Sequence, residues 1–331
     1  MQEDALDDLD QRLIHALQIS PRAPWSGLAP VLGADPVTLA RRWARLTQEG
    51  LVYVTGYGWD QGQLSLIEIE CSPGETLAVA HALAADREAF TIDLTAGGRD
   101  IMLTLGAAGT EAVASWTLER IRGVPGVRAM RTHLVSEVVT DARSWRMRAL
   151  SKDEVARVAA LDTRPTGGAV TVRPEQGRAI SVALTEDPRI GIAELAARAG
   201  MTPRRARDAL ATMRASGRFV MRVDVARAHT PWPIYAWYFL RVPAAMVARV
   251  GPQLGRMDEV RLVVTTVGEY NVVVAVWLRT LQDVGRLEAI IEERLPGVTI
   301  ADRSVVLRTT KHLGHLLDTR GRATPDTIPM P

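Results

Sequence analysis

Several features that define large classes of protein are scarce or missing in this sequence of 331 residues. Cys71 is the single cysteine, so no disulfide can form within the chain. No apolar run is long enough to span a bilayer, and the first residues lack the pattern of a signal peptide. We therefore expect a cytoplasmic protein with no membrane contact.

Recognisable catalytic and cofactor motifs are also missing. The sequence has neither a P-loop nor a dinucleotide fingerprint, and no serine or cysteine stands out as a nucleophile on a sharp turn beside a base. His312 and His315 have a spacing that suits a metal, but without an evident cysteine or carboxylate partner a helix surface is the better interpretation. We expect no enzyme, no cofactor and no bound metal.

The overall charge gives little guidance about partners. Net charge is +2, and only Lys152 and Lys311 are lysines among 40 basic residues. Such an arginine bias is typical of a GC-rich genome and is not in itself evidence for a nucleic-acid partner. The distribution of charge along the chain is therefore more informative than its sum.

What the sequence does contain is a helical pattern with both ends marked, at residues 35–50. Asp35 is a good N-cap, Pro36 suits the first helical position, and Gly50 suits a left-handed cap at the other end. One face is apolar and consists of Leu39, Trp43 and Leu46. A shorter helical pattern, residues 25–33, ends just before this helix, which is helix-turn-helix spacing.

The same pattern returns 167 residues later without a gap. The matched positions are Leu28-Ala29, Gly33, Asp35-Pro36 and Gly50 in the first copy, and Leu195-Ala196, Gly200, Thr202-Pro203 and Gly217 in the second. A further match, at an offset of 171 residues, links the stretch Gly97–Asp100 to Gly268–Asn271. A duplicated unit is the economical explanation.

After each helical unit the apolar pattern becomes alternating. Residues 64–139 and residues 235–308 both predict the order strand, helix, strand, strand, helix, strand, which is the βαββαβ order of a ferredoxin-like sandwich. The predicted fold class is therefore α+β, with winged or three-helix helix-turn-helix domains alternating with ferredoxin-like domains in one duplicated chain. Each sandwich leaves an apolar sheet face open, so we expect the sandwiches to pair by these faces, within a chain or between chains, and we expect a homo-oligomer, a dimer or larger.

The expected domains follow from these patterns. Residues 1–60 form a first helix-turn-helix domain, 61–142 a first ferredoxin-like domain, 143–173 a linker, 174–230 a second helix-turn-helix domain, 231–317 a second ferredoxin-like domain, and 318–331 a disordered polar tail.

This arrangement resembles the Lrp/AsnC family, the feast/famine transcriptional regulators. In the first helical unit the resemblance rests on Leu6-Asp7, Asp10, Leu17, Arg22, Leu28-Ala29, Arg42, Arg45-Leu46 and Gly50. In the sandwiches it rests on the stretches Gly97–Asp100 and Gly268–Asn271, which we call the two glycine turns, and on two Pro-Gly-Val triplets. Two copies of the family's pair of domains together account for nearly the whole chain, whereas a family member ordinarily has one copy. It implies that double-stranded DNA and a small-molecule effector, such as an amino acid bound at a subunit interface, are the partners.

The outward side of each second helix supplies the candidates for DNA binding. Short polar and arginine side chains near the start of a groove-entering helix can meet base edges, while flanking arginines meet phosphates. The predicted residues are Val37, Thr38 and Arg41 at base edges, Arg42 and Arg45 at phosphates, and Arg204, Arg205 and Arg207 in the second unit. An arginine cluster alone is more often a solvated surface, roughly two to one, but the capped helix pair and its duplication reverse that preference.

The two helical units differ in charge. Residues 1–60 carry five arginines and eight acidic residues, a net charge of −3, whereas residues 174–226 carry nine arginines and six acidic residues, a net charge of +3. Counterion release should therefore favour the second unit in nonspecific DNA binding. We predict that the two units read different half-sites.

The glycine turns are the candidate effector site. Small residues between two strands leave backbone amides open to a ligand carboxylate. On turn chemistry alone a plain hairpin is the better interpretation, about three times in four, and only the resemblance favours a ligand. The candidate residues are Gly97, Gly98, Arg99, Asp100, Gly268, Glu269, Tyr270 and Asn271.

Siroheme decarboxylases, which are enzymes, look like the same build and also occur as paired or fused units. Their tetrapyrrole site relies on histidine and tyrosine around the middle strands of the sandwich. Residues 90–93 and 263–266 contain no histidine, so the regulator is the preferred interpretation. A third alternative is that one or both helical units serve only in oligomerisation.

Overall fold

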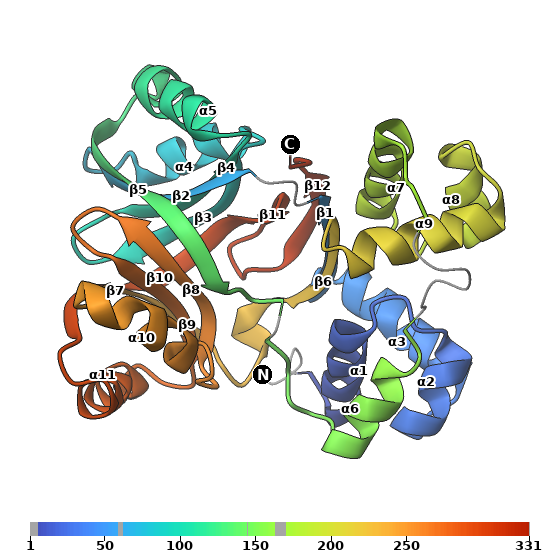
Figure 1. Cartoon of the computed structure of the whole chain (residues 1–331). Helices are drawn as coiled ribbons and strands as arrows, with labels where there is room; N and C mark the ends of the chain where they lie inside the picture. Colours follow the sequence, from blue (N-terminus) through green and yellow to red (C-terminus); the bar gives the residue numbers. More distant parts are fainter. Residues whose placement is uncertain (1–5, 59–61, 144, 163–169, 331) are drawn as a thin grey trace. The chain divides into compact units, whose positions relative to one another are not determined.

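The computed structural model describes residues 6–58, 62–143, 145–162 and 170–330. The chain forms two compact units, and each unit contains segments from both halves of the sequence (Figure 1). We call residues 1–60 with 146–225 the head unit, and residues 61–145 with 226–331 the sandwich unit. The sequence predicts separate domains in chain order, whereas the structure groups the two helical segments together and the two sandwiches together.

The first head, within residues 1–60, consists of α1 (Asp8–Ile19), α2 (Trp25–Leu32), α3 (Pro36–Gln48) and β1 (Val52–Gly58). The predicted caps of α3 are confirmed, because the Asp35 carboxylate accepts a hydrogen bond from the Thr38 amide at 2.9 Å and Gly50 has a φ of +67°. Its predicted apolar face is also confirmed, since Leu39, Trp43 and Leu46 are buried. These side chains hold α3 against the rest of the head and leave its other side to solvent.

The second head consists of α7 (Pro174–Glu186), α8 (Ile192–Arg198), α9 (Pro203–Ala215) and β6 (Phe219–Val225). Thr202 caps α9 by accepting a hydrogen bond from the Arg205 amide, and a buried cluster that includes Ile180, Leu195 and Leu210 forms the core. Strand β6 has no counterpart among the sequence predictions. The second head thus has the same element order as the first.

The predicted linker contains a helix, α6 (Lys152–Ala159), which begins at a capping box between Ser151 and Glu154. Helix α6 packs against α1 and α2, and Glu154 forms an ion pair with Arg12 of α1 at 2.6 Å. This part of the segment is therefore an additional helix of the head unit. Residues 163–169 of the predicted linker lie outside the described residues.

The two heads are joined by an antiparallel pair of strands, β1 and β6. Thr55 faces Arg222 at the centre of the pair, and these two residues are counterparts in the repeat of 167 residues. The ladder is therefore symmetric about its midpoint. Gly56 and Gly58 are both paired residues of β1.

Reciprocal side-chain contacts reinforce this junction. Arg22 donates hydrogen bonds to the carbonyls of Pro188 and Ile190, each at 2.6 Å. Its counterpart Arg189 donates to the carbonyls of Pro21 and Ala23, at 2.7 and 2.8 Å. We call β1, β6 and these two arginines the head junction.

The sandwich unit repeats one order of elements. Its first half contains β2 (Gln63–Cys71), α4 (Thr76–Ala84), β3 (Ala89–Ala96), β4 (Ile101–Ala107), α5 (Thr110–Ser115), extended by π-helical and 3-10 turns to Gly123, and β5 (Val127–Thr140). Its second half contains β7 (Ile234–Arg241), α10 (Val247–Leu254), β8 (Val260–Val267), β9 (Val272–Leu278), α11 (Gln282–Arg294) and β10 (Thr299–His312). The βαββαβ order predicted for each half is confirmed.

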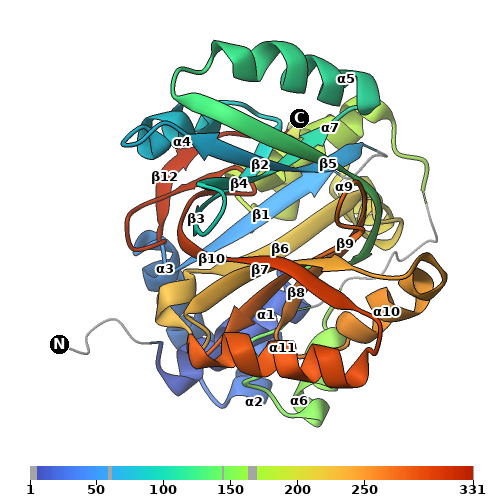
Figure 2. The same cartoon turned by 90° about the vertical axis from the view of Figure 1, so that its left-hand side faces the viewer.

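The eight main strands of this unit close into a ring. Strand β5 pairs with β2 along its first part and with β8 along its last part, and β10 pairs with β7 and then with β3 in the same way. The order around the ring is β10, β3, β4, β2, β5, β8, β9, β7 and back to β10. Figure 2 shows α4 and α5 outside one part of the ring and α10 and α11 outside the opposite part.

Two apolar cores lie under these helices, and the inner face of the ring carries other side chains. Ile67, Ile92 and Leu103 belong to one core, and Tyr238 and Val274 to the other. The sheet faces that the sequence leaves open are therefore covered within one chain. The main reason to expect association with a second chain is therefore removed, because the open sheet faces are already covered.

The last segment forms strands, which corrects the prediction of a disordered tail. Strand β11 (His315–Leu317) turns back from β10 at Leu313 and Gly314, and β12 (Ala323–Thr327) pairs with β11. His312 and His315 face each other across this hairpin, so they do not lie on a helix surface. Hydrogen bonds from Arg87 to the carbonyls of Pro329 and Met330 hold the end of the segment. Among the described residues, no helix has the length and apolarity needed to cross a membrane.

Candidate functional sites

The outward side of α3 carries the predicted base-edge residues. Val37 is 75% exposed, which is unusual for a large apolar side chain in the first turn of a helix with a well-packed opposite face. Thr38 is half-buried, and Arg41 is exposed and joins no ion pair among the described residues. Their position suits contact with a groove, and their assignment to DNA stays a prediction.

Arg42 and Arg45 of α3 are engaged within the head. Arg42 contacts the carboxylates of Asp7 at 2.5 Å and Asp10 at 2.9 Å, and Arg45 contacts Asp10 at 2.6 Å and Glu49 at 3.1 Å. Burial would raise the pKa of Asp7, but hydrogen bonds from Arg42 and from the Asp10 amide lower it. The two arginines therefore brace α3 against α1, which competes with their predicted role at phosphates.

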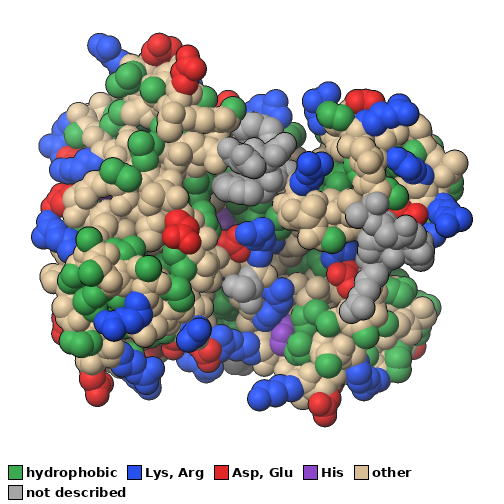
Figure 3. All heavy atoms as spheres, in the orientation of Figure 1, with side chains coloured by type: hydrophobic (Ala, Val, Ile, Leu, Met, Phe, Trp, Pro, Cys, Tyr) green, Lys and Arg blue, Asp and Glu red, His purple; other side chains and the backbone are tan. Residues whose placement is uncertain are grey.

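The surface of α9 is more cationic than that of α3. Arg204 and Arg205 are exposed and Arg207 is half-buried, and Arg205 donates one hydrogen bond to the Thr171 carbonyl at 2.8 Å. Asp208, the counterpart of Arg41, is buried. On the face drawn in Figure 3, basic side chains are spread over the surface of α7, α8 and α9.

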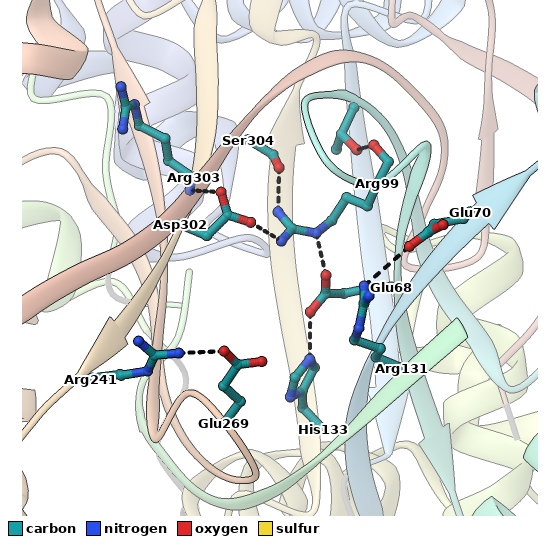
Figure 4. A network of polar contacts seen from close by, with 11 residues as sticks. Glu68, Glu70, Arg99, Arg131, His133, Arg241, Glu269, Asp302, Arg303 and Ser304 are labelled. Carbon is teal, nitrogen blue, oxygen red and sulfur yellow. Dashed lines mark hydrogen bonds and ion pairs between the residues drawn. The ribbon is translucent and has the colours of Figure 1, made fainter. Parts of the chain in front are cut away.

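The first glycine turn places Arg99 inside the ring, where it is only 3% exposed (Figure 4). Its guanidinium donates to Glu68 at 2.6 Å and also to Ser304 and Asp302, which come from β10 in the other half of the unit. The same group lies 4.0 Å from the ring centre of Phe239 on β7. Arg99 therefore links strands from both halves of the sandwich unit.

The second glycine turn is less enclosed. Tyr270, the counterpart of Arg99, is half-buried, and its ring centre lies 5.7 Å from that of His133 on β5. Glu269 is exposed and pairs with Arg241. Gly268 has a φ of +151°, and a Cβ atom there would lie 3.3 Å from Nδ1 of His133.

His133 connects the two turns. Its Nε2 atom lies 2.6 Å from Glu68, so that nitrogen carries a proton and donates to the carboxylate. Its Nδ1 atom is buried and has no hydrogen-bond partner among the described atoms. Burial would raise the pKa of Glu68, but the hydrogen bond from His133 and the charge of Arg99 lower it, which keeps the carboxylate ionised.

Two of the predicted effector residues make hydrogen bonds that give them a structural role. The Asp100 carboxylate accepts a hydrogen bond from the Cys71 amide at 2.7 Å. Its counterpart Asn271 accepts from the Val242 amide at 2.8 Å and donates to the Val242 carbonyl at 2.7 Å. Both side chains therefore fasten a glycine turn to the end of a neighbouring strand.

Sequence reasoning missed the polar residues that face the interior of the ring: Glu68, Asp93, His133, Asp302 and Ser304. Asp93 is fully buried and accepts hydrogen bonds from Trp237 at 3.1 Å and Thr309 at 2.6 Å, and burial raises its pKa. Each of these residues occupies an alternate position of its strand, on the face away from the helices. That pattern indicates a buried polar interior, but it does not show which of these residues contact one another. No group of three or more His, Cys, Asp or Glu side chains in the described ranges could hold a metal ion.

Comparisons with known protein families match the first half of the chain. A family model described as an AsnC-type helix-turn-helix domain matches residues 6–47, and one described as the Lrp/AsnC ligand binding domain matches residues 64–145. The first half therefore matches an AsnC-type helix-turn-helix domain followed by a Lrp/AsnC ligand binding domain. The second half has the same element order, as described above.

Similar proteins include an uncharacterized HTH-type transcriptional regulator of Pyrococcus furiosus, 21% identical over 42% of this chain and 95% of that protein. The HTH-type transcriptional regulator AldR of Mycolicibacterium smegmatis is 26% identical over 40% of this chain and 82% of that protein. Among solved structures, the siroheme decarboxylase NirDL matches with a TM-score of 0.58 and 15% identity, covering 93% of both chains. At that identity the likeness concerns the fold alone.

Proposed function

We propose that this chain is a sequence-specific DNA-binding transcriptional regulator of the Lrp/AsnC type, built from two fused family units and without enzymatic activity. The regulators AldR and that of Pyrococcus furiosus, which are similar to the first half, support this proposal. In this proposal the two heads bind double-stranded DNA, and the sandwich unit binds a small-molecule effector.

The observation that carries the proposal is the head junction. Symmetric pairing of β1 with β6, with Arg22 and Arg189 exchanging equivalent hydrogen bonds, relates the two heads by an approximate two-fold axis within one chain. Dimeric helix-turn-helix proteins use such an axis to place two reading helices in major grooves about 34 Å apart. A single chain of this protein would then act as the equivalent of a dimer.

DNase footprinting tests this arrangement. We expect one chain to protect two neighbouring stretches of a promoter fragment at low ionic strength, and Arg41→Ala to weaken protection of one stretch. Arg128→Ala, an exposed arginine of the sandwich unit with an ion pair to Glu70, is the matched control and should leave the footprint unchanged. Absence of any preferred fragment would contradict the proposal.

An effector is proposed to bind at the second glycine turn, beside Tyr270 and the unpartnered Nδ1 atom of His133. The chain passes between the units at residues 60–61, 145–146 and 225–226, so a change in the sandwich unit can be transmitted to the heads through three connections. An effector alters DNA affinity only if it binds differently to the DNA-free and DNA-bound states.

Calorimetric titration with the standard amino acids tests effector binding, followed by DNA binding with and without any amino acid that gives heat. We expect Tyr270→Ala to abolish the heat and the change in DNA affinity while DNA binding itself persists. If no amino acid gives heat or alters DNA affinity, the effector part of the proposal is wrong.

One observation favours an alternative function, a siroheme-decarboxylase-like enzyme. His133 lies inside the ring between Glu68 and Tyr270, and it supplies a histidine that the middle strands lack. The likeness in fold to NirDL extends over both halves of the chain. Incubation with siroheme, followed by absorption spectra and mass analysis, distinguishes the alternatives, because loss of carboxyl groups from the tetrapyrrole would require an enzyme.

A further inference from the structure

The reading helices α3 and α9 present different chemistry at equivalent positions. Val37 on α3 is 75% exposed, and the residue 167 positions later is Arg204, which is also exposed. Thr38 corresponds in the same way to Arg205. An exposed valine at this position gains nothing from packing within the head, but its methyl groups suit apolar contact with the C5-methyl group of thymine.

Helix α3 has little positive charge free for phosphates. Arg42 and Arg45 are bound by Asp7, Asp10 and Glu49, and Asp10 is almost fully buried. Arg41 is the arginine of α3 that is exposed and joins no ion pair among the described residues. The excess of acidic residues in 1–60, a net charge of −3, adds repulsion toward a DNA backbone.

Helix α9 has the opposite character. Arg204 and Arg207 form no ion pair among the described residues, and Arg205 contacts a carbonyl rather than a carboxylate. The acidic residue of this helix, Asp208, is buried and lies one helical turn after Arg204. The net charge of +3 in residues 174–226 therefore acts together with the outward arginines.

From this difference we propose a division of labour between the heads, which rests on the proposed function of DNA binding. Helix α3 selects the bases of one half-site, with Val37 against a thymine methyl group. Helix α9 binds the neighbouring half-site mainly through its phosphates, with Arg204 and Arg207. The preferred operator is therefore asymmetric, with strong base preference on one side and weak preference on the other.

Selection from a library of random-sequence duplexes gives the operator and tests its symmetry. We expect a half-site that contains a required thymine, joined to a half-site with little sequence preference. Analytical ultracentrifugation of the complex should give one chain for each duplex. An operator with the same preferred sequence in both half-sites would overturn the proposal.

Replacing thymine by deoxyuridine in the selected duplex removes only the C5-methyl group and tests Val37 directly. For the wild-type chain, affinity should fall on the order of 4-fold when the required thymine is replaced. The variant Val37→Ala should bind the two duplexes equally. Val182→Ala, which shortens another exposed valine of the head unit, is the matched control and should keep the wild-type penalty. A penalty that persists in Val37→Ala overturns the proposed contact.

The salt dependence of binding tests the role of α9. The double variant Arg204→Ala/Arg207→Ala should lower the slope of log affinity against log salt by about 2, and equally on selected and mixed-sequence duplexes. The matched control is Arg198→Ala, because Arg198 is held by Glu186 and Glu194 on the same head. An equal change of slope in this control, or none in the double variant, overturns the proposal.

These experiments distinguish a failure of the proposed DNA binding from a failure of the proposed division of labour. A chain that shows no DNA binding at low salt contradicts the proposed function, and the division of labour with it. A chain that binds DNA tightly but selects a symmetric operator, or that shows no effect of the thymine methyl group, keeps the proposed function and loses the division of labour.

Discussion

At the head junction, the principal hydrogen bonds made by one half of the chain are returned by counterparts in the other half. Arg22 and Arg189 exchange equivalent hydrogen bonds, and Gln18 and Thr185, also counterparts, donate to the carbonyls of Val223 and Gly56. Inside the sandwich ring three pairs of counterparts differ in chemistry. Arg99 corresponds to Tyr270, Glu68 to Phe239 and Ser304 to His133.

The difference indicates which parts of the molecule can change without loss of structure. A junction that sets the relation of two heads needs matching contacts on both sides of its axis, because an isologous interface uses each surface twice. A ligand site has no such requirement. One glycine turn is filled by its own arginine, and the other retains a half-buried tyrosine and an unpartnered histidine nitrogen. Symmetry is therefore retained in the framework and lost in the candidate effector site.

Removing Arg99 should produce the largest loss of stability. The variant Arg99→Ala leaves the Glu68 carboxylate buried beside His133 without its cation, which costs roughly 3–5 kcal/mol for a buried pair. Tyr270→Ala, at the equivalent position, should cost about 1–2 kcal/mol because Tyr270 is partly exposed. Urea denaturation of both variants checks the comparison.

A double variant distinguishes the charge effect from lost packing. In Glu68→Leu/Arg99→Leu both buried charges are removed, so the loss should be smaller than in Arg99→Ala alone. Equal stability of Arg99→Ala and Tyr270→Ala would contradict the view that the two turns have diverged.

The head junction offers the second prediction. Arg22→Ala and Arg189→Ala each leave two carbonyl groups without a donor, so each should lower the stability of the head unit by roughly 2–3 kcal/mol. Arg189→Ala should have the larger effect, because Arg189 also lies 3.9 Å from the ring centre of Trp25. Thermal unfolding measures the two losses.

The double variant Arg22→Ala/Arg189→Ala should lose more than the sum of the two single losses, because each single variant already relieves the repulsion between the two arginines and the double variant relieves it only once. Burial, together with the nearby positive charge of Arg22, lowers the pKa of Arg189 to about 10, so the two guanidinium groups repel each other. Additive losses would show that the two contacts do not belong to one junction.

The secondary structure of this protein is largely readable from its sequence because its signals are local. The cap at Asp35, the left-handed Gly50 and the apolar face of α3 all lie within a few residues of one another. The strand and turn patterns around the two glycine turns are similarly local. Strand β6 was not predicted, although its short apolar run follows Gly217 and precedes Pro231 and Pro233.

Contacts between distant residues explain what the sequence did not reveal. The partners of Arg42 and Arg45 in α1 are 32 and 35 residues away, and a spacing pattern does not indicate whether an arginine meets a phosphate or a carboxylate. The partners of Arg99 in β10 are more than 200 residues away. They meet because β5 and β10 each pair with both halves of the ring, which no local signal encodes.

The third prediction concerns an asymmetry beside the symmetric junction. His15 on α1 is buried and accepts a hydrogen bond from the Leu150 amide at 2.9 Å, whereas its counterpart Val182 is exposed. Burial, with the charges of Arg146 and Arg148, lowers the pKa of His15 to about 4. Because the unfolded state binds this proton first, stability should fall as the pH drops from 6.5 toward 4.

At pH 5 the expected loss from His15 is about 2 kcal/mol relative to pH 7. The variant His15→Gln retains a hydrogen-bond acceptor and does not titrate, so its stability should be nearly constant over this range. Carboxylates such as Glu68, whose pKa is lowered, contribute their loss only below about pH 4.5. Urea denaturation at several pH values measures both. An equal pH dependence in His15→Gln and wild type would assign the loss to another group.

The smallest effects should come from alanine at the two turn glycines, where the backbones are alike and the neighbours differ. Gly97 and Gly268 both have positive φ angles, +119° and +151°, so alanine should cost roughly 1–2 kcal/mol at either position. At Gly97 the new Cβ atom meets Ser304, which is fixed by Arg99, whereas at Gly268 it meets the unpartnered Nδ1 of His133. Gly268→Ala should therefore also reduce effector binding in calorimetry, and Gly97→Ala should not. Equal loss of binding in both variants would indicate that both turns take part in the effector site, and that the difference between Arg99 and Tyr270 does not separate them.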